Sequence, residues 1–212
     1  DPIKVSALIA ALARNTATTV TNATLIRDMS DVDSIRIDPR TVADYLDTLR
    51  RLFVLNEIPP WAPALRSPVR FRQAPKRMLT DPSLATAALG ATAATLAADR
   101  KTLGLFVESL VLRDLRIFAD ANQARLFHYR DNAGLEADAI ITWPDGRWGA
   151  FEIKLGEGQI DTAASNLIRL RDKIVAGGDR PPTVLATIIA TGGFSHQRPD
   201  GTLVLPFDRL AP

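Results

Sequence analysis

The chain has 212 residues, of which 46% are hydrophobic and 24% are charged, and its formal net charge is +2. This composition is typical of a globular protein with one good core or two small ones, and it excludes a disordered chain. The chain lacks cysteine and any apolar run near the ~18 residues of a membrane span, which excludes disulfides, thiolate zinc sites and a membrane helix. We expect a cytoplasmic protein with no membrane partner and, because the chain does not begin with Met, a fragment of a longer one.

The first 80 residues have the pattern of short helices followed by a β-ribbon. The predicted elements are helices over 3–14, 22–29 and 39–52 and an extended run over 53–58. Asn22 is expected to cap the second helix, and Asp38-Pro39 is a strong start signal for the third. This order predicts a winged-helix or helix-turn-helix module over residues 1–80.

A basic stretch without acidic residues follows the extended run. Its members are Arg66, Arg70, Arg72, Lys76 and Arg77. As the wing of the module, this stretch would offer contacts to the DNA backbone, although such a run is also typical of a solvated surface. Asp44 and Asp47 on the exposed face of the third helix would repel phosphates, so docking to another domain stays as an alternative to base recognition.

Residues 81–102 are rich in Ala and Thr, and we expect a weak helix and a connector there. A second module is predicted over 103–212. Its predicted elements are a helix over 104–119, strands over 126–130, 138–143 and 148–154, a helix over 161–175, and strands over 184–190 and 202–205. The strand over 184–190 is expected to be buried, and the resulting order, α-β-β-β-α-β, predicts an α/β domain.

The segment Trp143-Pro144-Asp145-Gly146-Arg147 predicts a tight hairpin, since Pro, Asp and Gly suit successive positions of a type I turn with a bulge. This turn pairs Trp143 with Arg147 and therefore sets Asp138 opposite Glu152, on one face of the sheet. The residues expected on the other face, as the core face, are Ala139, Ile141, Trp143, Gly149, Phe151 and Ile153.

Two opposed carboxylates raise each other's pKa unless a cation lies between them, and Mg²⁺ or Mn²⁺ prefers such oxygen ligands. We expect Asp138, Glu152 and the carbonyl of Ile153 to bind this metal, while Lys154 orients the attacking water or helps to deprotonate it. Glu108 lies on the apolar stripe of the preceding helix and is expected as a further ligand. An E-x-K pattern alone would look identical on a solvated strand face, and Arg130 fits a phosphate contact and an ordinary salt bridge equally well.

These residues resemble the PD-(D/E)XK nuclease-like superfamily, whose minimal core has the αβββαβ order. The whole chain looks like the C-terminal part of a prokaryotic family of predicted AAA+ ATPases with a winged helix and a nuclease-like domain. The segments that carry the likeness are Thr41–Leu46, Pro75-Lys76, Asp81–Leu84, Glu108, His128–Arg130, Glu136–Asp138 and Phe151–Lys154. Ala137 stands where the superfamily motif has proline. The chain has no GxxxxGK(S/T) motif, so the P-loop ATPase domain that the resemblance implies as a partner is not in it.

Two functions follow as hypotheses. The first is a Mg²⁺-dependent nuclease, a hydrolase of phosphodiester bonds in DNA. The second is a catalytically silent module that binds DNA or a protein partner and regulates the attached ATPase, because nuclease-like folds can keep the scaffold without the chemistry.

Overall fold

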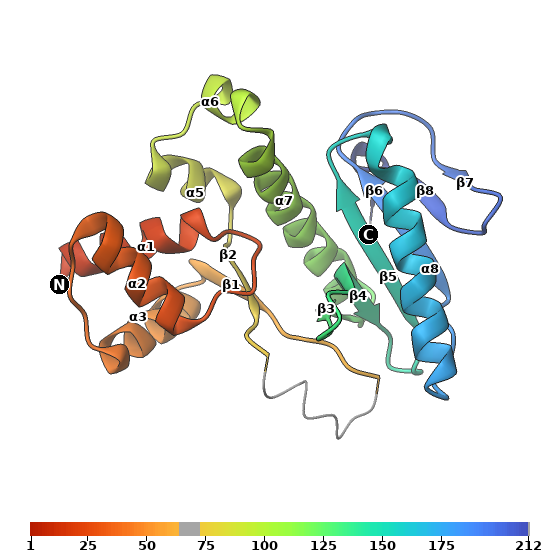
Figure 1. Cartoon of the computed structure of the whole chain (residues 1–212), viewed down its shortest axis with the longest axis horizontal. Helices are drawn as coiled ribbons and strands as arrows, with labels where there is room; N and C mark the ends of the chain where they lie inside the picture. The colour runs from red at the N-terminus through yellow and green to blue at the C-terminus, as the bar shows by residue number, and fades with distance from the viewer. Residues whose placement is uncertain (64–72, 212) are drawn as a thin grey trace. The chain divides into compact units, whose positions relative to one another are not determined.

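The computed structural model describes residues 1–63 and 73–211, and these form a mixed α/β protein. The chain divides into two compact units (Figure 1). The first unit comprises Asp1–Ile58 and Ala74–Leu110, and the second comprises Pro59–Gln73 and Val111–Pro212. Within the described residues, no helix combines the length and the apolar character needed to cross a bilayer.

The first unit begins with three helices. They are α1 (Pro2–Arg14), α2 (Asn22–Asp33) and α3 (Pro39–Arg51). The Asp38 side chain accepts from the N–H of Arg40 at 2.8 Å, which confirms the predicted start of α3. The predicted cap of α2 is wrong by one residue: Asn22 is the first helical residue, and the hydroxyl of Thr21 accepts from the N–H of Thr24 at 3.1 Å.

A two-stranded antiparallel sheet follows, made of β1 (Leu55–Ile58) and β2 (Lys76–Leu79). The next segment, 81–102, was expected to hold a weak helix and a connector. It contains two capped helices, α5 (Pro82–Leu89) and α6 (Ala93–Ala98), and the start of α7 (Arg100–Ala121). Ala85 is fully buried in the core of the first unit, and Leu89 and Leu96 pack against that core. These helices are therefore part of the first unit, which continues to Leu110.

The core of the first unit is built from the inner faces of α1, α2 and α3. Its largest fully buried side chains include Leu8, Leu12, Leu25, Met29 and Leu46. On α1 the buried positions recur at helical spacing, as an amphipathic helix requires. The same spacing in the sequence predicted these helices, and the structure confirms it.

The second unit contains the end of α7 and a six-stranded sheet. Its other elements are β3 (Arg125–Arg130), β4 (Glu136–Thr142), β5 (Trp148–Lys154), η1 (Glu157–Gln159), α8 (Ile160–Ala176), β6 (Val184–Ile189), β7 (His196–Gln197), β8 (Leu203–Pro206) and η2 (Phe207–Arg209). The strand order is β3-β4-β5-β6-β8-β7. The predicted α-β-β-β-α-β order is confirmed, with β3 to β5 antiparallel and β5, β6 and β8 parallel.

The β4–β5 hairpin has the predicted register. The N–H of Trp143 donates to the carbonyl of Arg147 at 2.9 Å, and Gly146 closes the turn with a φ of +83°. Glycine suits this position because it adopts positive φ without a steric penalty. Ala139 pairs with Phe151, so Asp138 and Glu152 occupy the next position outward in this register.

Both faces of the sheet are buried, whereas only one core face was expected. Figure 1 shows α8 lying along β5 and β6. The buried cluster that joins the helix to the sheet includes Ile140, Trp148, Ala150, Leu167, Leu170 and Leu185. The opposite face carries the buried residues Ala139, Phe151, Ile153, Ala186 and Ile188. Parallel strands in the middle of a sheet are commonly covered on both faces. Glu152 therefore lies at the end of the face that α8 covers.

Candidate functional site

A β-bulge on β4 falls at Asp138. Phe127 pairs with Ile140, but Tyr129 pairs with Ala137, so the register shifts by one between them. His128 on β3 therefore stands against two residues of β4, Asp138 and Ala139. A bulge of this kind bends the strand and redirects a side chain, and bulges are frequent beside active sites.

The bulge places the Asp138 carboxylate beside the end of β5. The backbone ladder of β4 and β5 ends at Ala139 and Phe151. Beyond it, the N–H of Ile153 donates to Asp138 Oδ2 at 2.8 Å, so a side chain replaces the missing backbone acceptor. This hydrogen bond fixes the Asp138 carboxylate near the C-terminal end of β5.

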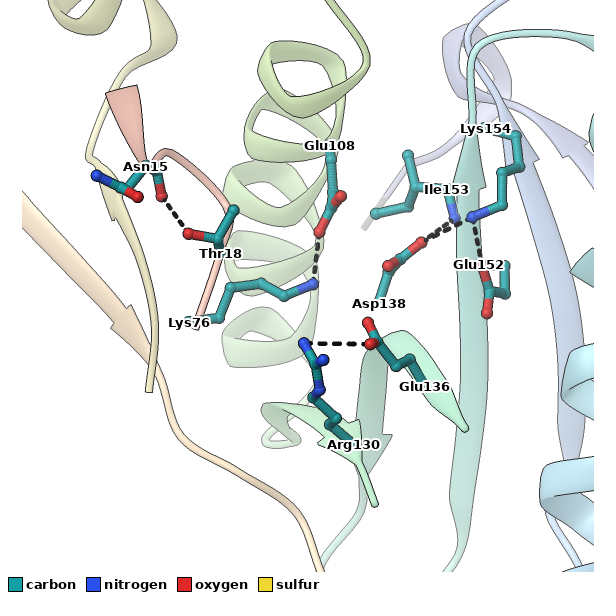
Figure 2. Close-up of polar contacts among 10 residues, drawn as sticks. All are labelled: Asn15, Thr18, Lys76, Glu108, Arg130, Glu136, Asp138, Glu152, Ile153 and Lys154. Carbon is teal, nitrogen blue, oxygen red and sulfur yellow. Dashed lines mark hydrogen bonds and ion pairs between the residues drawn. The ribbon is translucent and has the colours of Figure 1, made fainter. Parts of the chain in front are cut away.

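Lys154 joins the two carboxylates that the hairpin brings together. Its Nζ lies 2.5 Å from Glu152 Oε2 and 3.4 Å from Asp138 Oδ2 (Figure 2). The side chains of Glu152, Asp138 and Lys154 are 5%, 14% and 22% exposed. The three charged groups thus form a compact, largely desolvated cluster, in which the ammonium offsets the repulsion between the two acids. We call Asp138, Glu152 and Lys154 the acid–lysine cluster.

The cluster changes the titration of its lysine. Burial by itself lowers the pKa of Lys154, but the negative charges of Asp138 and Glu152 and the hydrogen bonds to both outweigh it. The pKa of Lys154 therefore lies above its usual value, and the side chain is an ammonium group at neutral pH. In this state Lys154 donates hydrogen bonds and carries positive charge. Its predicted help in deprotonating a water stays a prediction.

Thr187 extends the cluster across the sheet and was not predicted as a site residue. It is the partner of Glu152 in the β5–β6 ladder, so both side chains lie on the same face. Thr187 is fully buried, and its hydroxyl has no hydrogen-bond partner among the described residues. The sequence does contain a signal for it, because Thr187 is the polar residue of the otherwise apolar strand Val184–Ile189.

Glu108 belongs to the first unit, where it pairs with Lys76. Lys76 Nζ donates to Glu108 Oε1 at 2.5 Å, and the two side chains are 10% and 14% exposed (Figure 2). A largely buried carboxylate needs such a partner, which gives Glu108 a structural role in its own unit. Its role as a further metal ligand stays a prediction. In the described ranges, 1–63 and 73–211, no group of three or more His, Asp or Glu side chains is gathered closely enough to hold a metal ion.

The structure describes only part of the predicted basic stretch. Arg66, Arg70 and Arg72 lie outside the described residues. Lys76 and Arg77 are 8% and 7% exposed, so both side chains are inside the first unit and not on its surface.

Arg77 makes the ion pair and hydrogen bonds that its burial demands. Its Nε lies 2.8 Å from Glu57 Oε1, and its guanidinium also donates to Asn22 Oδ1 at 2.7 Å and to the carbonyl of Val20 at 3.2 Å. These contacts attach β2 to β1 and to the start of α2. The structure therefore corrects the expected role of Lys76 and Arg77 as exposed wing residues.

Arg130, the remaining predicted phosphate contact, forms a surface salt bridge. Its guanidinium lies 3.2 Å from Glu136 Oε1, and the two side chains are 51% and 48% exposed (Figure 2). An exposed pair of this kind contributes little to stability and is readily exchanged for another partner. Of the two interpretations of Arg130, the structure shows the salt bridge.

The acid–lysine cluster and Thr187 offer the chemistry that a hard divalent cation requires. Two carboxylates at the end of one strand pair supply charged oxygen ligands, and the buried hydroxyl of Thr187 is an oxygen whose hydrogen bonding is incomplete. An Mg²⁺ ion keeps several of its waters, so two carboxylates are a sufficient protein contribution. The residues present therefore fit such an ion, which would compete with the ammonium of Lys154 for both acids.

The fold and the cluster define an α/β protein with a mixed sheet and a charged site at the end of β5. A comparison with protein-family models adds the family. Residues 103–210, just over half of the chain, match the domain of unknown function DUF4143, and the chain belongs to this family. That domain is often found with AAA ATPases. Residues 1–95 match a second domain of unknown function, DUF8612. Comparisons with curated proteins and with solved structures found no match.

Proposed function

We propose that the second unit is a nuclease-like domain that hydrolyses phosphodiester bonds of DNA with Mg²⁺ or Mn²⁺. The observation that carries this proposal is the acid–lysine cluster. Two carboxylates and one ammonium from adjacent strands converge at one end of the sheet. Such a combination suits a reaction in which negative charge develops on a phosphate.

Each residue of the cluster has a role in this proposal. Asp138 and Glu152 would hold the metal, together with the Ile153 carbonyl, which belongs to the residue whose N–H already binds Asp138. When bound, the metal would stabilise charge on the phosphate oxygens and lower the pKa of a water. Lys154 would position the phosphate or orient the attacking water through hydrogen bonds.

The element order supports the same proposal. The sequence α7, β3, β4, β5, α8, β6 is the αβββαβ order of restriction-endonuclease-like domains, and the acids lie on its second and third strands. In the first unit, three helices and a two-stranded sheet have the order of a winged helix. We propose that the full-length protein also contains a P-loop ATPase domain, to which this unit docks.

A specific observation favours a second function. Lys154 already compensates both carboxylates, and the described residues contain no third acid gathered with them. This arrangement is also what a catalytically silent domain would keep if the ion pair were needed only for stability. In that case the chain is a module that binds DNA or a protein partner and regulates the attached ATPase.

Metal titration and DNA cleavage by the same variants distinguish the two functions. The whole chain is titrated with Mn²⁺ by calorimetry and incubated with plasmid DNA and Mg²⁺ or Mn²⁺. The variants are Asp138→Asn, Glu152→Gln and Lys154→Met. For a nuclease, we expect Asp138→Asn and Glu152→Gln to weaken Mn²⁺ binding, and all three variants to lower cleavage at least 100-fold.

Glu136→Gln is the matched control, because it removes one carboxylate from the same strand without touching the cluster. It should leave Mn²⁺ binding and cleavage unchanged. Mn²⁺ or DNA binding without cleavage would support the silent module. If Asp138→Asn and Lys154→Met still cleave DNA, the assignment of the acid–lysine cluster as the active site is wrong.

A further inference from the structure

A cavity of the second unit lies at the opposite end of β4 and β5 from the acid–lysine cluster. It has a volume of about 420 Å³, within the range of small-molecule sites. Its lining residues come from β3, β4, β5, the β4–β5 turn, the loop after α8 and the segment that follows β1. Trp148 and Glu152 are four residues apart on β5, which separates the cavity from the acid–lysine cluster by about 13 Å.

The apolar wall of the cavity is made of closely packed, largely buried aromatic rings. Trp61 and Trp148 lie with ring centroids 4.8 Å apart, and the Trp61 and Tyr129 rings pack in a T-shaped arrangement with centroids 6.0 Å apart. Trp61 is held on β3 through its N–H, which donates to the carbonyl of His128 at 2.7 Å. These contacts are made within the protein, so the wall does not need a ligand to take this shape, and ordering it adds little to the entropic cost of binding.

The loop after α8 is tied to the same wall. The indole N–H of Trp148 donates to the carbonyl of Arg180 at 2.9 Å. The N–H and the hydroxyl of Thr183 both donate to the carbonyl of Trp148, at 2.8 and 2.9 Å. These three hydrogen bonds hold the backbone that carries Asp179 and Arg180 against the start of β5.

Two guanidinium groups line this cavity without an ion-pair partner among the described residues. Arg125 lies with its guanidinium 5.4 Å from the centroid of the Phe127 ring, and Arg180 extends over the β4–β5 turn near Gly146. Other cations of this unit do have carboxylate partners, as Lys173 and Arg147 show. Both arginines are exposed, so an anion that enters the cavity can reach their guanidinium groups and form charge-assisted hydrogen bonds with them.

From this geometry we infer that the cavity binds a nucleoside phosphate, with the phosphate on Arg125 and Arg180 and the planar base against the apolar wall. The cavity is larger than a phosphate ion requires, and its wall consists of tryptophan and phenylalanine. Asp179 adds a carboxylate to the lining. This carboxylate can accept hydrogen bonds from the amino groups of a base, a contact that inorganic phosphate lacks, so we expect a nucleotide to bind more tightly than inorganic phosphate.

Tryptophan fluorescence tests the inference directly. Trp61 and Trp148 line the cavity and Trp143 does not, so the whole chain is used with Trp143→Phe to leave only the two reporters. The probes are adenosine monophosphate, inorganic phosphate and a 5′-phosphorylated single-stranded oligonucleotide. We expect adenosine monophosphate to change the tryptophan fluorescence saturably, with half of the change reached at a concentration at least tenfold lower than for inorganic phosphate.

The double variant Arg125→Gln/Arg180→Gln should weaken binding of adenosine monophosphate at least tenfold. Arg147→Gln is the matched control, because it removes a guanidinium of the same hairpin that is paired with Asp145 at 2.6 Å and lies outside the lining. It should leave binding unchanged. Tighter binding of the oligonucleotide than of the mononucleotide would identify a strand end as the source of the ligand, and the reverse would identify a free nucleotide.

Two results would overturn the inference: no saturable change with either nucleotide probe, or equal affinity in the double variant. The cavity contains no residue of the acid–lysine cluster. Failure of metal binding or cleavage at that cluster therefore leaves the result for the cavity unaffected, and the reverse also holds.

Discussion

Lys154 illustrates how a single side chain can stabilise a site and also limit its chemistry. The side chains of Glu152 and Asp138 are only 5% and 14% exposed, and burying two carboxylates without a cation would cost folding free energy. The ammonium group of Lys154 is that cation. The same contacts raise the pKa of Lys154 and keep it protonated. A divalent cation therefore has to compete with a charge that the protein already provides.

Thr187 gives a prediction at the residue scale. Thr187→Val has the same shape but lacks the buried hydroxyl, whose hydrogen bond is not made within the described residues. In EDTA we expect the free energy of unfolding, measured by urea denaturation, to rise by about 1 kcal/mol. We expect Mn²⁺ binding, measured by calorimetry, to weaken several-fold because an oxygen beside Glu152 is lost.

Thr187→Ser restores the hydroxyl and should restore Mn²⁺ binding while leaving a small cavity in the core. If Thr187→Val binds Mn²⁺ as the unchanged chain does, Thr187 is only a packing residue.

The β3–β4 connection shows how one acid organises an element. Asp131 Oδ1 accepts from the N–H groups of Ala133 and Leu135 at 2.8 and 2.9 Å, and Oδ2 pairs with Lys173 of α8 at 2.5 Å. Burial raises the pKa of Asp131, but these hydrogen bonds outweigh burial and hold the pKa below its usual value. The carboxylate thus closes the turn and attaches it to the helix.

This lowered pKa predicts a pH dependence of stability. A carboxyl group whose pKa is lower in the folded state stabilises the protein above the unfolded value of about 3.9. That contribution is lost as the pH falls through the lowered pKa of the folded state. Asp131→Asn should therefore reduce the free energy of unfolding by about 1 kcal/mol at pH 7. The difference from the unchanged chain should vanish at strongly acidic pH. Thermal denaturation across pH 2–7 measures it, and a difference independent of pH would contradict the assignment.

The β4–β5 hairpin and the β4 bulge differ in how far the sequence predicts them. The hairpin register depends on five consecutive residues, 143–147, whose turn preferences are local, and the structure confirms it. The bulge at Asp138 depends on pairing with β3, where His128 faces two residues. The position of a bulge depends on how the residues of both strands pair, so the residues of β4 alone did not reveal it.

At the scale of the whole molecule, the two units have separate hydrophobic cores. The first is built around Leu12 and the second around Leu167, both almost fully buried. We predict two unfolding transitions in differential scanning calorimetry. Leu12→Ala should destabilise one transition by about 2–5 kcal/mol, and Leu167→Ala should destabilise the other by a similar amount. A single transition that responds equally to both substitutions would contradict two independently cooperative units.

The sequence by itself determined the first three helices, the α-β-β-β-α-β order of the second unit and the convergence of Asp138 and Glu152. These features follow from periodicity and turn chemistry, which act over a few neighbouring residues. Only the tertiary structure decided what each charge contacts. Lys76 and Arg77 looked like exposed wing residues and are buried in ion pairs, because β2 packs inside the first unit. Thr187 and the cavity between Arg125 and Arg180 likewise arise from pairings between segments far apart in the chain.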